Sequence, residues 1–354
     1  MPSIGAVVIN FNGGDCVINT VYALHQQDVS LEKIIVVDSG STDGSPERIQ
    51  EIFEDVQIVK LSKDKGPSKA RNVGLELCTT DLVLLVDDDV YVAEDCISYM
   101  LELFNREKPT VICPRVILYP ELNIVQSDGA EAHFVGTMVL RNGYLPVKTV
   151  QGKESIVGGC ISACLLVDRH LVLKAGGFDE EYFFYMEDLE FCIRLRSLGH
   201  RIIFEPYAVA YHDRGIGTPG LSFRGKGKYP SRRAYLMIRN RLMTIMIHYK
   251  TRTLAVLLPA LAIYELASLV MVLFKGWLSE WVWAWRWQIR NKRAVLLRRT
   301  MMQQIRALND GDLLVGGPPP LTPGLLNSNI ALAAFNTLSE ILNWYWHICK
   351  HWIG

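Results

Sequence analysis

The sequence has no excess of charge of either sign, because its 37 basic residues are balanced by 37 acidic ones. Nucleic-acid binding calls for a basic surface, so we expect no nucleic-acid partner. The eight cysteines include no CxxC pair and no finger-like spacing, which argues against a zinc site. A chain of 354 residues needs no disulfide framework, so the reducing cytosol is the expected setting. The first residues also lack the basic leader of a signal peptide.

Apolar residues are abundant, with a mean hydropathy of +0.15, and they gather in the last third of the chain. Leu254–Phe274 contains one charged residue, Glu265, and is just long enough to span a bilayer. Tryptophans and basic residues are mixed over 277–299, as is typical of the interface between headgroups and water. Asn329–Ile348 is a second mostly apolar segment. We expect a helical membrane-associating region, either with one or two membrane helices or lying on the surface. The alternative is a pair of helices buried in a soluble core.

The first third of the chain alternates between strand and helix patterns with short loops. This alternation predicts an α/β fold with a mainly parallel, doubly wound sheet. We expect strands at Ile4–Asn10, Lys33–Asp38, Val56–Leu61 and Leu82–Val86, and helices at Cys16–Gln27, Glu47–Phe53 and Pro67–Cys78. Further along, the patterns predict a strand at Thr110–Leu118, a helix at Glu187–Leu198, a strand at Arg201–Phe204 and a flexible basic loop at 213–233.

An acid triplet, Asp87–Asp89, follows the uninterrupted apolar run Leu82–Val86. In an open α/β sheet the ligand crevice lies at the carboxyl ends of the strands. Three carboxylates there need a counter-charge, and hard oxygen ligands suit Mg²⁺ or Mn²⁺. The alternative is a surface turn with solvated acids.

Two further loops carry polar groups that suit a ligand. Asp38 ends the second strand and opens a loop of small residues that extends to Ser45, where a carboxylate can accept from a base or a ribose hydroxyl. Lys65, Lys69 and Arg71 surround the start of the third helix and can attract an anion. The alternatives are a simple turn with a helix cap and a solvated basic turn.

An acidic pair, Glu187 and Asp188, begins a helix after a run of aromatic residues. Apolar neighbours raise a carboxylate pKa and favour a general base, whereas a helix N-terminus steadies the ionised form. His212 ends a short strand and is a candidate metal ligand as a neutral imidazole. The alternatives are ordinary first-turn acids and a structural histidine.

These signals are stronger in their order than alone, and together they make the chain resemble the family-2 inverting glycosyltransferases, which have the GT-A fold. The resemblance covers about residues 3–245 and its motifs are specific for the family rather than for any sugar. It rests on Val8–Asn12, Asp38–Ser45, Lys69–Gly74, Asp87–Asp89, Gly176–Asp179, Phe184–Asp188, Arg194–Arg196, Gly199, Tyr211-His212 and Arg239-Asn240.

The resemblance implies a role for each matched residue. It places the catalytic base at Asp188, next to Glu187. It implies that metal ligands come from Asp87, Asp89 and His212, with Asp89 the preferred ligand, and that the metal is Mg²⁺ or Mn²⁺. Donor-binding residues would be Asn10, Asp38, Arg71, Asp87 and Asp88. The strip Val157–Cys160 is expected near the sugar or the acceptor.

The predicted protein is therefore a metal-dependent inverting glycosyltransferase on the cytoplasmic face of a membrane. Its donor would be a UDP-, dTDP- or GDP-linked sugar, and its acceptor a hydroxyl of a lipid-linked or cell-envelope glycan. We expect 1–110 to bind the nucleotide sugar, 111–245 to bind the acceptor and 246–354 to meet the membrane. A polyprenyl-phosphate sugar synthase, whose phosphate acceptor needs no base, is the alternative enzyme, and a non-catalytic scaffold is the alternative class.

Overall fold

A computed structural model describes residues 2–213, 231–321, 325–326 and 328–353. The chain divides into two compact units. The first comprises Met1–Ala130, Leu140–Leu195 and His200–Gly215, and the second comprises Glu131–Val139, Arg196–Gly199 and Ile216–Gly354. The expected division by ligand at residues 110 and 245 stays a prediction, because compactness does not report which ligand each part binds.

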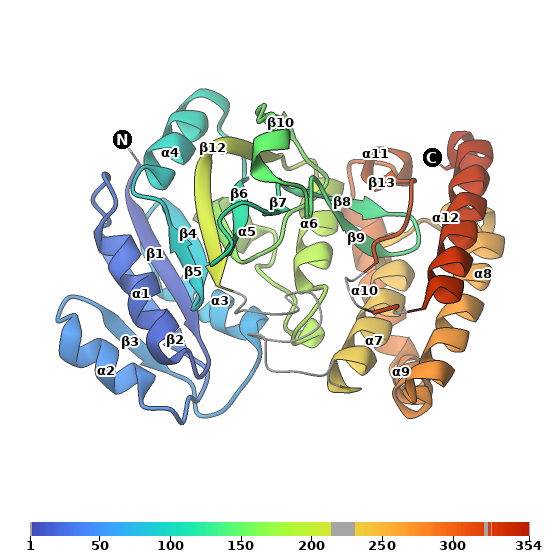
Figure 1. The fold of residues 1–354 in the computed structure, drawn as a ribbon, viewed down its shortest axis with the longest axis horizontal. Helices are drawn as coiled ribbons and strands as arrows, with labels where there is room; N and C mark the ends of the chain where they lie inside the picture. Colours follow the sequence, from blue (N-terminus) through green and yellow to red (C-terminus); the bar gives the residue numbers. More distant parts are fainter. Residues whose placement is uncertain (1, 214–230, 322–324, 327, 354) are drawn as a thin grey trace. The chain divides into compact units, whose positions relative to one another are not determined.

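A ten-stranded mixed sheet forms the first unit, and its main path runs β10-β12-β6-β11-β4-β1-β2-β3 (Figure 1). Strands β3, β2, β1 and β4 are parallel, and the antiparallel β11 joins them to the parallel pair β6 and β12. The strands span β1 Ile4–Asn10, β2 Lys33–Asp38, β3 Gln57–Lys60, β4 Leu82–Asp87, β5 Val90–Val92, β6 Val111–Tyr119, β7 Val125–Ser127, β10 Ser155–Ile156, β11 Cys164–Asp168 and β12 Ile202–Asp213.

The strand order reverses around β1, because the chain goes from β1 to β2 and β3 on one side and returns to β4 on the other. Such a switch point opens a crevice at the carboxyl ends of its strands. The register brings Asn10 opposite Asp38 and Ile9 opposite Asp87. The fold therefore brings together the ends of the strands on which the sequence places polar residues.

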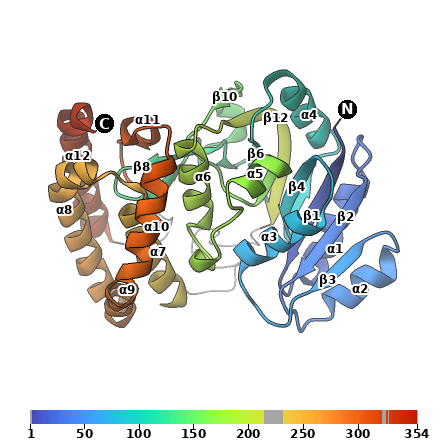
Figure 2. The same cartoon turned by 180° about the vertical axis from the view of Figure 1, so that it is seen from behind.

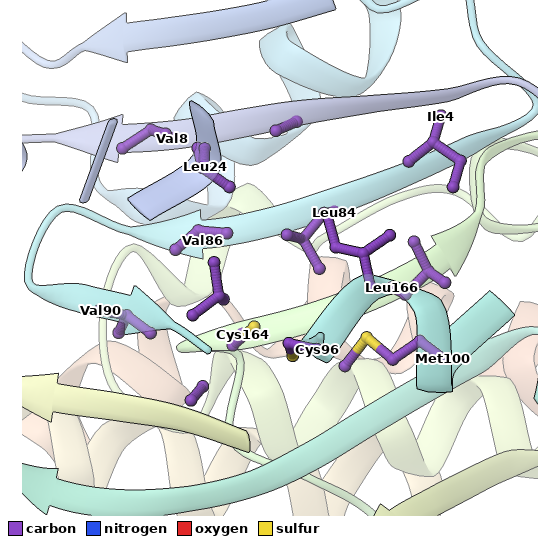
Figure 3. Close-up of a cluster of buried hydrophobic side chains, with 14 of the residues drawn as sticks. Ile4, Val8, Leu24, Leu84, Val86, Val90, Cys96, Met100, Cys164 and Leu166 are labelled. Carbon is purple, nitrogen blue, oxygen red and sulfur yellow. The ribbon is translucent and has the colours of Figure 1, made fainter. Parts of the chain in front are cut away.

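Two hydrophobic cores cover the two faces of this sheet. Residues of β1 alternate between them, with Ile4, Ala6 and Val8 in one core and Val7 and Ile9 in the other. This alternation is what a strand covered on both faces requires. The first core is closed by α1 (Gly14–His25), α2 (Ser45–Ile52) and α4 (Cys96–Glu107), and Figure 3 shows part of it. The second is closed by α3 (Pro67–Leu77), α5 (Arg169–Lys174) and α6 (Glu187–Ser197), which lie in front of the sheet in Figure 2.

The second unit is mainly helical. Helix α7 packs against α9 and α10, and α8 packs against α9 and α12. These helices span α7 Ser231–His248, α8 Thr251–Lys275, α9 Leu278–Arg290, α10 Lys292–Ile305, α11 Asp310–Leu313 and α12 Asn329–Cys349. A small sheet has the strand order β13-β8-β9, with β13 Leu314–Val315, β8 Ala130–His133 and β9 Thr137–Leu140. A short 3₁₀ turn lies at Lys350–Trp352, and two others, at Val147–Thr149 and Glu180–Tyr182, belong to the first unit.

Glu265, the one charged residue of the stretch Leu254–Phe274 in helix α8, has internal partners. Glu265 accepts from Arg241 at 2.8 Å and from the indole nitrogens of Trp281 and Trp285 at 2.8 and 3.0 Å. Two of the tryptophans that the sequence assigns to a membrane interface therefore donate hydrogen bonds to a half-buried acid, which gives them a role inside the unit. Within the described residues, α8 is the helix that is long and apolar enough to cross a membrane.

The predicted elements of the first third of the chain are confirmed to within about two residues at their ends. The sequence reasoning did not identify α4, and the strand expected at Arg201–Phe204 continues as β12 to Asp213. The basic loop expected at 213–233 lies, over 214–230, outside the described residues.

Candidate active site

Asn10 organises the loops that follow β1 and β2. Its buried amide donates to Asp38 Oδ1 at 2.8 Å and to Ser45 Oγ at 3.0 Å, and its Oδ1 accepts from Gly13 N at 3.2 Å. A fully buried amide must satisfy its donors and acceptor within the protein. Asn10 therefore shapes the crevice by holding two loops together.

Asp38 is also committed to its own loop. Its Oδ2 accepts from Gly40 N at 3.1 Å and Ser41 N at 3.0 Å, while its Oδ1 accepts from Asn10 and from Ser41 Oγ at 2.5 Å. The residue is 2% exposed. In this arrangement Asp38 fixes the conformation of the loop that a nucleotide would meet. The expected contact between its carboxylate and a base stays a prediction.

The three aspartates after β4 point to three different partners. Asp87 accepts from Arg71 at 2.6 Å, Asp88 accepts from Phe11 N at 3.0 Å, and Asp89 lies 3.2 Å from His212 Nε2. Asp88 and Asp89 are buried. The solvated surface turn, which was the alternative for this triplet, is therefore wrong, because the fold buries two of the three acids and pairs all three.

Arg71 on α3 joins two acidic elements that are far apart in sequence. Its Nη2 donates to Asp87 Oδ1 at 2.6 Å and to Ser162 O at 3.3 Å, and its Nη1 donates to Glu187 Oε1 at 3.3 Å. The guanidinium also lies 5.3 Å from the ring centre of Phe178. Its side chain is 2% exposed, so the ion pairs are shielded from solvent. Arg71 thus holds the end of β4 next to the start of α6.

Asn72, the neighbour of Arg71, fixes α3 against the loop before α6. Its Nδ2 donates to Phe178 O at 2.8 Å, and its Oδ1 accepts from Phe178 N at 2.7 Å. A Cβ at Gly177 would lie 2.5 Å from Asn72 Oδ1, and Gly177 has φ +63°, so this contact needs a glycine. The sequence reasoning quoted Asn72 within a motif without giving it a role.

The acidic pair begins α6 after a strained stretch of backbone. Phe183, Tyr185 and Met186 all have positive φ, between 62° and 65°. Each such residue costs about 1–3 kcal/mol and persists only where the surrounding structure enforces it. This strained backbone sets the direction in which Glu187 and Asp188 enter the site. No local sequence pattern predicts it.

Glu187 and Asp188 differ in their access to solvent. Glu187 is buried against Arg71, and its Oε2 has no hydrogen-bond partner among the described residues. Asp188 is half-buried and its Oδ1 accepts from Leu189 N at 2.8 Å. Burial raises the pKa of both carboxyls, and it outweighs the backbone N–H groups at the helix start. Asp188 is therefore the more exposed member of the pair, and its expected role as general base stays a prediction.

Asp89 and His212 are placed as two neighbouring ligands of one cation would be. Around an octahedral Mg²⁺, with bonds of about 2.0–2.1 Å, adjacent ligand atoms lie about 3 Å apart, and His212 Nε2 is 3.2 Å from Asp89 Oδ1. The Nδ1 of His212 has no hydrogen-bond partner among the described residues. Among the described residues, no group of three histidine, cysteine or acidic side chains is placed to hold a metal ion. Asp87, the third expected ligand, pairs with Arg71 instead.

Comparison with known proteins identifies the domain that bears Asn10, Asp38, Arg71 and the acid triplet. Residues 6–168 match the sequence model of the family described as glycosyl transferase family 2. The chain carries a family-2 glycosyltransferase domain. Similar curated proteins include the pre-mycofactocin glycosyltransferase of Mycobacterium tuberculosis, at 29% identity over 51% of this chain and 37% of that protein. The chain thus spans less than half the length of that relative.

Two other curated proteins are similar to the glycosyltransferase domain. The N-acetylglucosaminyl-diphospho-decaprenol L-rhamnosyltransferase of Mycobacterium tuberculosis is 26% identical over 52% of this chain and 67% of that protein. The poly-beta-1,6-N-acetyl-D-glucosamine synthase of Staphylococcus aureus is 24% identical over 57% of this chain and 47% of that protein.

Solved structures confirm the GT-A fold of the glycosyltransferase domain, which a helical region follows. GalNAc-T7 with UDP, GalNAc and Mn²⁺ aligns with a TM-score of 0.59 at 11% identity, over 83% of this chain and 58% of that one. TarS 1-349 of S. aureus with UDP-GlcNAc aligns with a TM-score of 0.50 at 16% identity, over 75% and 72%. At such identities the likeness shows the fold alone.

Arg71 provides the first prediction. Arg71→Met should lower the free energy of unfolding by about 3–5 kcal/mol, because it leaves Asp87 and Glu187 buried without their cation. Arg48→Met is the matched control, since Arg48 pairs with Asp15 at the surface, and it should change stability by at most about 1 kcal/mol. Urea unfolding of the purified proteins measures both. An Arg71→Met protein with unchanged stability and no nucleotide binding would show instead that Arg71 serves the donor directly.

Proposed function

We propose that this protein is an inverting, metal-dependent glycosyltransferase that moves a sugar from a nucleotide-sugar donor to a hydroxyl of a cell-envelope or lipid-linked glycan. The observation that carries the proposal is the bridge from Asp87 through Arg71 to Glu187, because it joins the acid triplet to the carboxylate pair. Two relatives, a rhamnosyltransferase of a decaprenol diphosphate and a polysaccharide synthase, support the acceptor class.

In the proposed reaction Asp188 removes the proton from the acceptor hydroxyl. The oxygen then attacks the anomeric carbon, the bond to the donor diphosphate breaks, and the anomeric configuration inverts in a single displacement. No covalent sugar intermediate forms, so no second nucleophilic carboxylate is needed. Glu187 takes no proton in this scheme. It holds Arg71 and thereby the position of its neighbour Asp188.

The donor side of the site is assigned to the ends of β1, β2 and β4. Asn10 and Asp38 hold the loops for the nucleotide, and Asp88 fixes the backbone at Phe11. Asp89 and His212 would hold Mg²⁺ or Mn²⁺, with Asp87 beside them, and a bound cation would neutralise charge on the leaving diphosphate. Two structural neighbours are complexes with UDP or UDP-GlcNAc, and one of them also contains Mn²⁺, which supports this donor class.

Asp188→Asn should reduce turnover by about 10²–10⁴-fold, which is the usual contribution of a general base. The assay is sugar transfer with a panel of UDP-, dTDP- and GDP-sugars, and Glu181→Gln, an exposed acid of the preceding turn, is the control. Because burial raises the pKa of Asp188, wild-type activity should fall with decreasing pH well above pH 4, where an ordinary aspartate titrates at about 3.9. Full activity of Asp188→Asn with polyprenyl phosphate as acceptor would favour the polyprenyl-phosphate sugar synthase.

Donor binding can be tested without turnover. One nucleotide sugar of the panel should raise the melting temperature in the presence of Mn²⁺, since a ligand at 100 times its Kd stabilises the fold by about 2.7 kcal/mol. His212→Ala should remove the part of the shift that depends on Mn²⁺. His25→Ala, which alters a surface histidine paired with Asp55, should leave that part unchanged. Absence of any nucleotide binding would support the non-catalytic scaffold.

We assign the second unit to the cytoplasmic face of a membrane, where it lies in the interface. None of the eight cysteines, all of which lie in the described part of the chain, forms a disulfide, in keeping with a reducing compartment. Helices α8, α9, α10 and α12 expose large apolar side chains, among them Phe274, Trp283, Leu297 and Trp344. Basic residues alternate with them on α9 and α10, as on helices that lie flat on a bilayer.

Membrane binding should resist high salt because apolar contact, unlike surface charge, is not screened. The chain should pellet with vesicles of anionic and zwitterionic lipid in 1 M NaCl, a condition in which the Debye length is about 3 Å. The double variant Leu296→Glu/Leu297→Glu should move to the supernatant, whereas Leu122→Glu, at an exposed leucine of the first unit, should not. Complete release of the wild-type chain by salt would leave only a weak electrostatic contact.

A further inference from the structure

A surface depression lies in the first unit at the end of β12 away from His212. Its volume is about 400 Å³, and its walls come from α4, the segment 152–154 and Glu205–Tyr207 of β12. Glu205 and His212 pair with Pro114 and Leu118 of β6. These partners are four positions apart, so at about 3.3 Å per residue Glu205 lies about 13 Å along the sheet from His212. The depression is therefore distinct from the site described above.

A bulge in β12 forms one wall of the depression. Glu205 pairs with Pro114 and Val209 with Arg115, so the three residues between them have no counterpart on β6. A bulge redirects side chains, and here it leaves Tyr207 65% exposed. A Cβ at Gly152 would lie 2.4 Å from Pro206 Cβ, so segment 152–154 lies directly against the bulge. The bulge is therefore in contact with segment 152–154, which forms another wall of the depression.

Two tyrosines form an aromatic pair at this place. The ring centres of Tyr207 and Tyr99 of α4 are 5.7 Å apart, with 34° between the ring planes. Both side chains line the depression. An exposed aromatic pair in a hollow offers apolar faces to a ligand without losing contact with water at its hydroxyl groups.

The polar groups around the tyrosines are mixed in sign. Glu205 is 6% exposed, and its carboxylate Oε1 accepts a hydrogen bond from Tyr207 N at 3.0 Å. Burial raises the pKa of this carboxyl. Glu102 and Glu154 add two further acids, and Arg106, which pairs with Glu154, and Lys153 add two cations. Three acids against two cations disfavour a phosphate or a second nucleotide.

We propose that this depression binds a pyranose segment of a neutral glycan. The sugar would stack on Tyr99 and Tyr207, donate from its hydroxyls to Glu205 and accept from Arg106. A pyranose presents one C–H face and a rim of hydroxyls, which matches an aromatic platform ringed by charged donors and acceptors. The assignment rests on the proposed function, because it gives the acceptor chain a second holding point away from the reacting hydroxyl.

The test is direct binding, which needs no turnover. Chitopentaose, cellopentaose and mannopentaose are titrated into the purified full chain by calorimetry. At least one should bind, and Tyr207→Ala should weaken its affinity by about fivefold or more, as loss of an aromatic contact predicts. Tyr22→Ala is the matched control, since Tyr22 is 59% exposed on α1. Glu205→Gln should also weaken binding. Failure of all three sugars to bind, or equal affinity in Tyr207→Ala, would overturn the proposal.

Two further measurements separate the possible results. Tetramethylammonium is titrated as a competitor, because two tyrosines beside acids also suit a quaternary ammonium, and its displacement of the sugar with tighter binding would overturn the glycan assignment. The melting-temperature shift with a nucleotide sugar and Mn²⁺ should be the same in Tyr207→Ala and in the wild-type chain. This shift reports on the proposed catalytic site alone, so a wild-type chain that shows the shift but binds none of the glycans would refute only the second site.

Discussion

The candidate site depends on one buried cation. Arg71 is nearly inaccessible to water, and a guanidinium in that position is tolerated only with carboxylates against it. Those carboxylates are Asp87, at the end of a sheet strand, and Glu187, at the start of a helix one hundred residues later. The ion pairs therefore fix the distance between the two acidic elements, and the requirement to satisfy Arg71 makes that distance a property of the fold.

Strained backbone and unfavourable charge burial accompany this arrangement around Arg71. Three non-glycine residues before α6 have positive φ, and two carboxyls are held where burial opposes their charge. Strained backbone and raised pKa values concentrate where a structure serves chemistry rather than stability. Asn72 and Gly177 supply the packing that keeps the strained loop in place. Contacts of α3 thus hold the strained backbone before α6 in place.

The second unit also contains a carboxylate, Glu265, that needs partners within the protein. Glu265 lies in an apolar helix, where it pairs with Arg241 and accepts hydrogen bonds from two tryptophan indoles. Large apolar side chains remain exposed on α8, α9, α10 and α12. These exposed side chains are the observation on which the proposed membrane contact rests.

The sequence by itself determined the alternation of strands and helices, the crevice at the strand ends and the positions of the acids, because these follow from local patterns of period 2 and 3.6. It also predicted that His212 would meet the acid triplet, through the family resemblance. Only the tertiary structure decided that the triplet splits among Arg71, Phe11 and His212, that Asp38 is bound to its own loop, and that Trp281 and Trp285 serve Glu265. The physical reason is that each of these contacts joins residues distant in sequence, and which donor reaches which carboxylate depends on register, helix packing and backbone strain that no local pattern records.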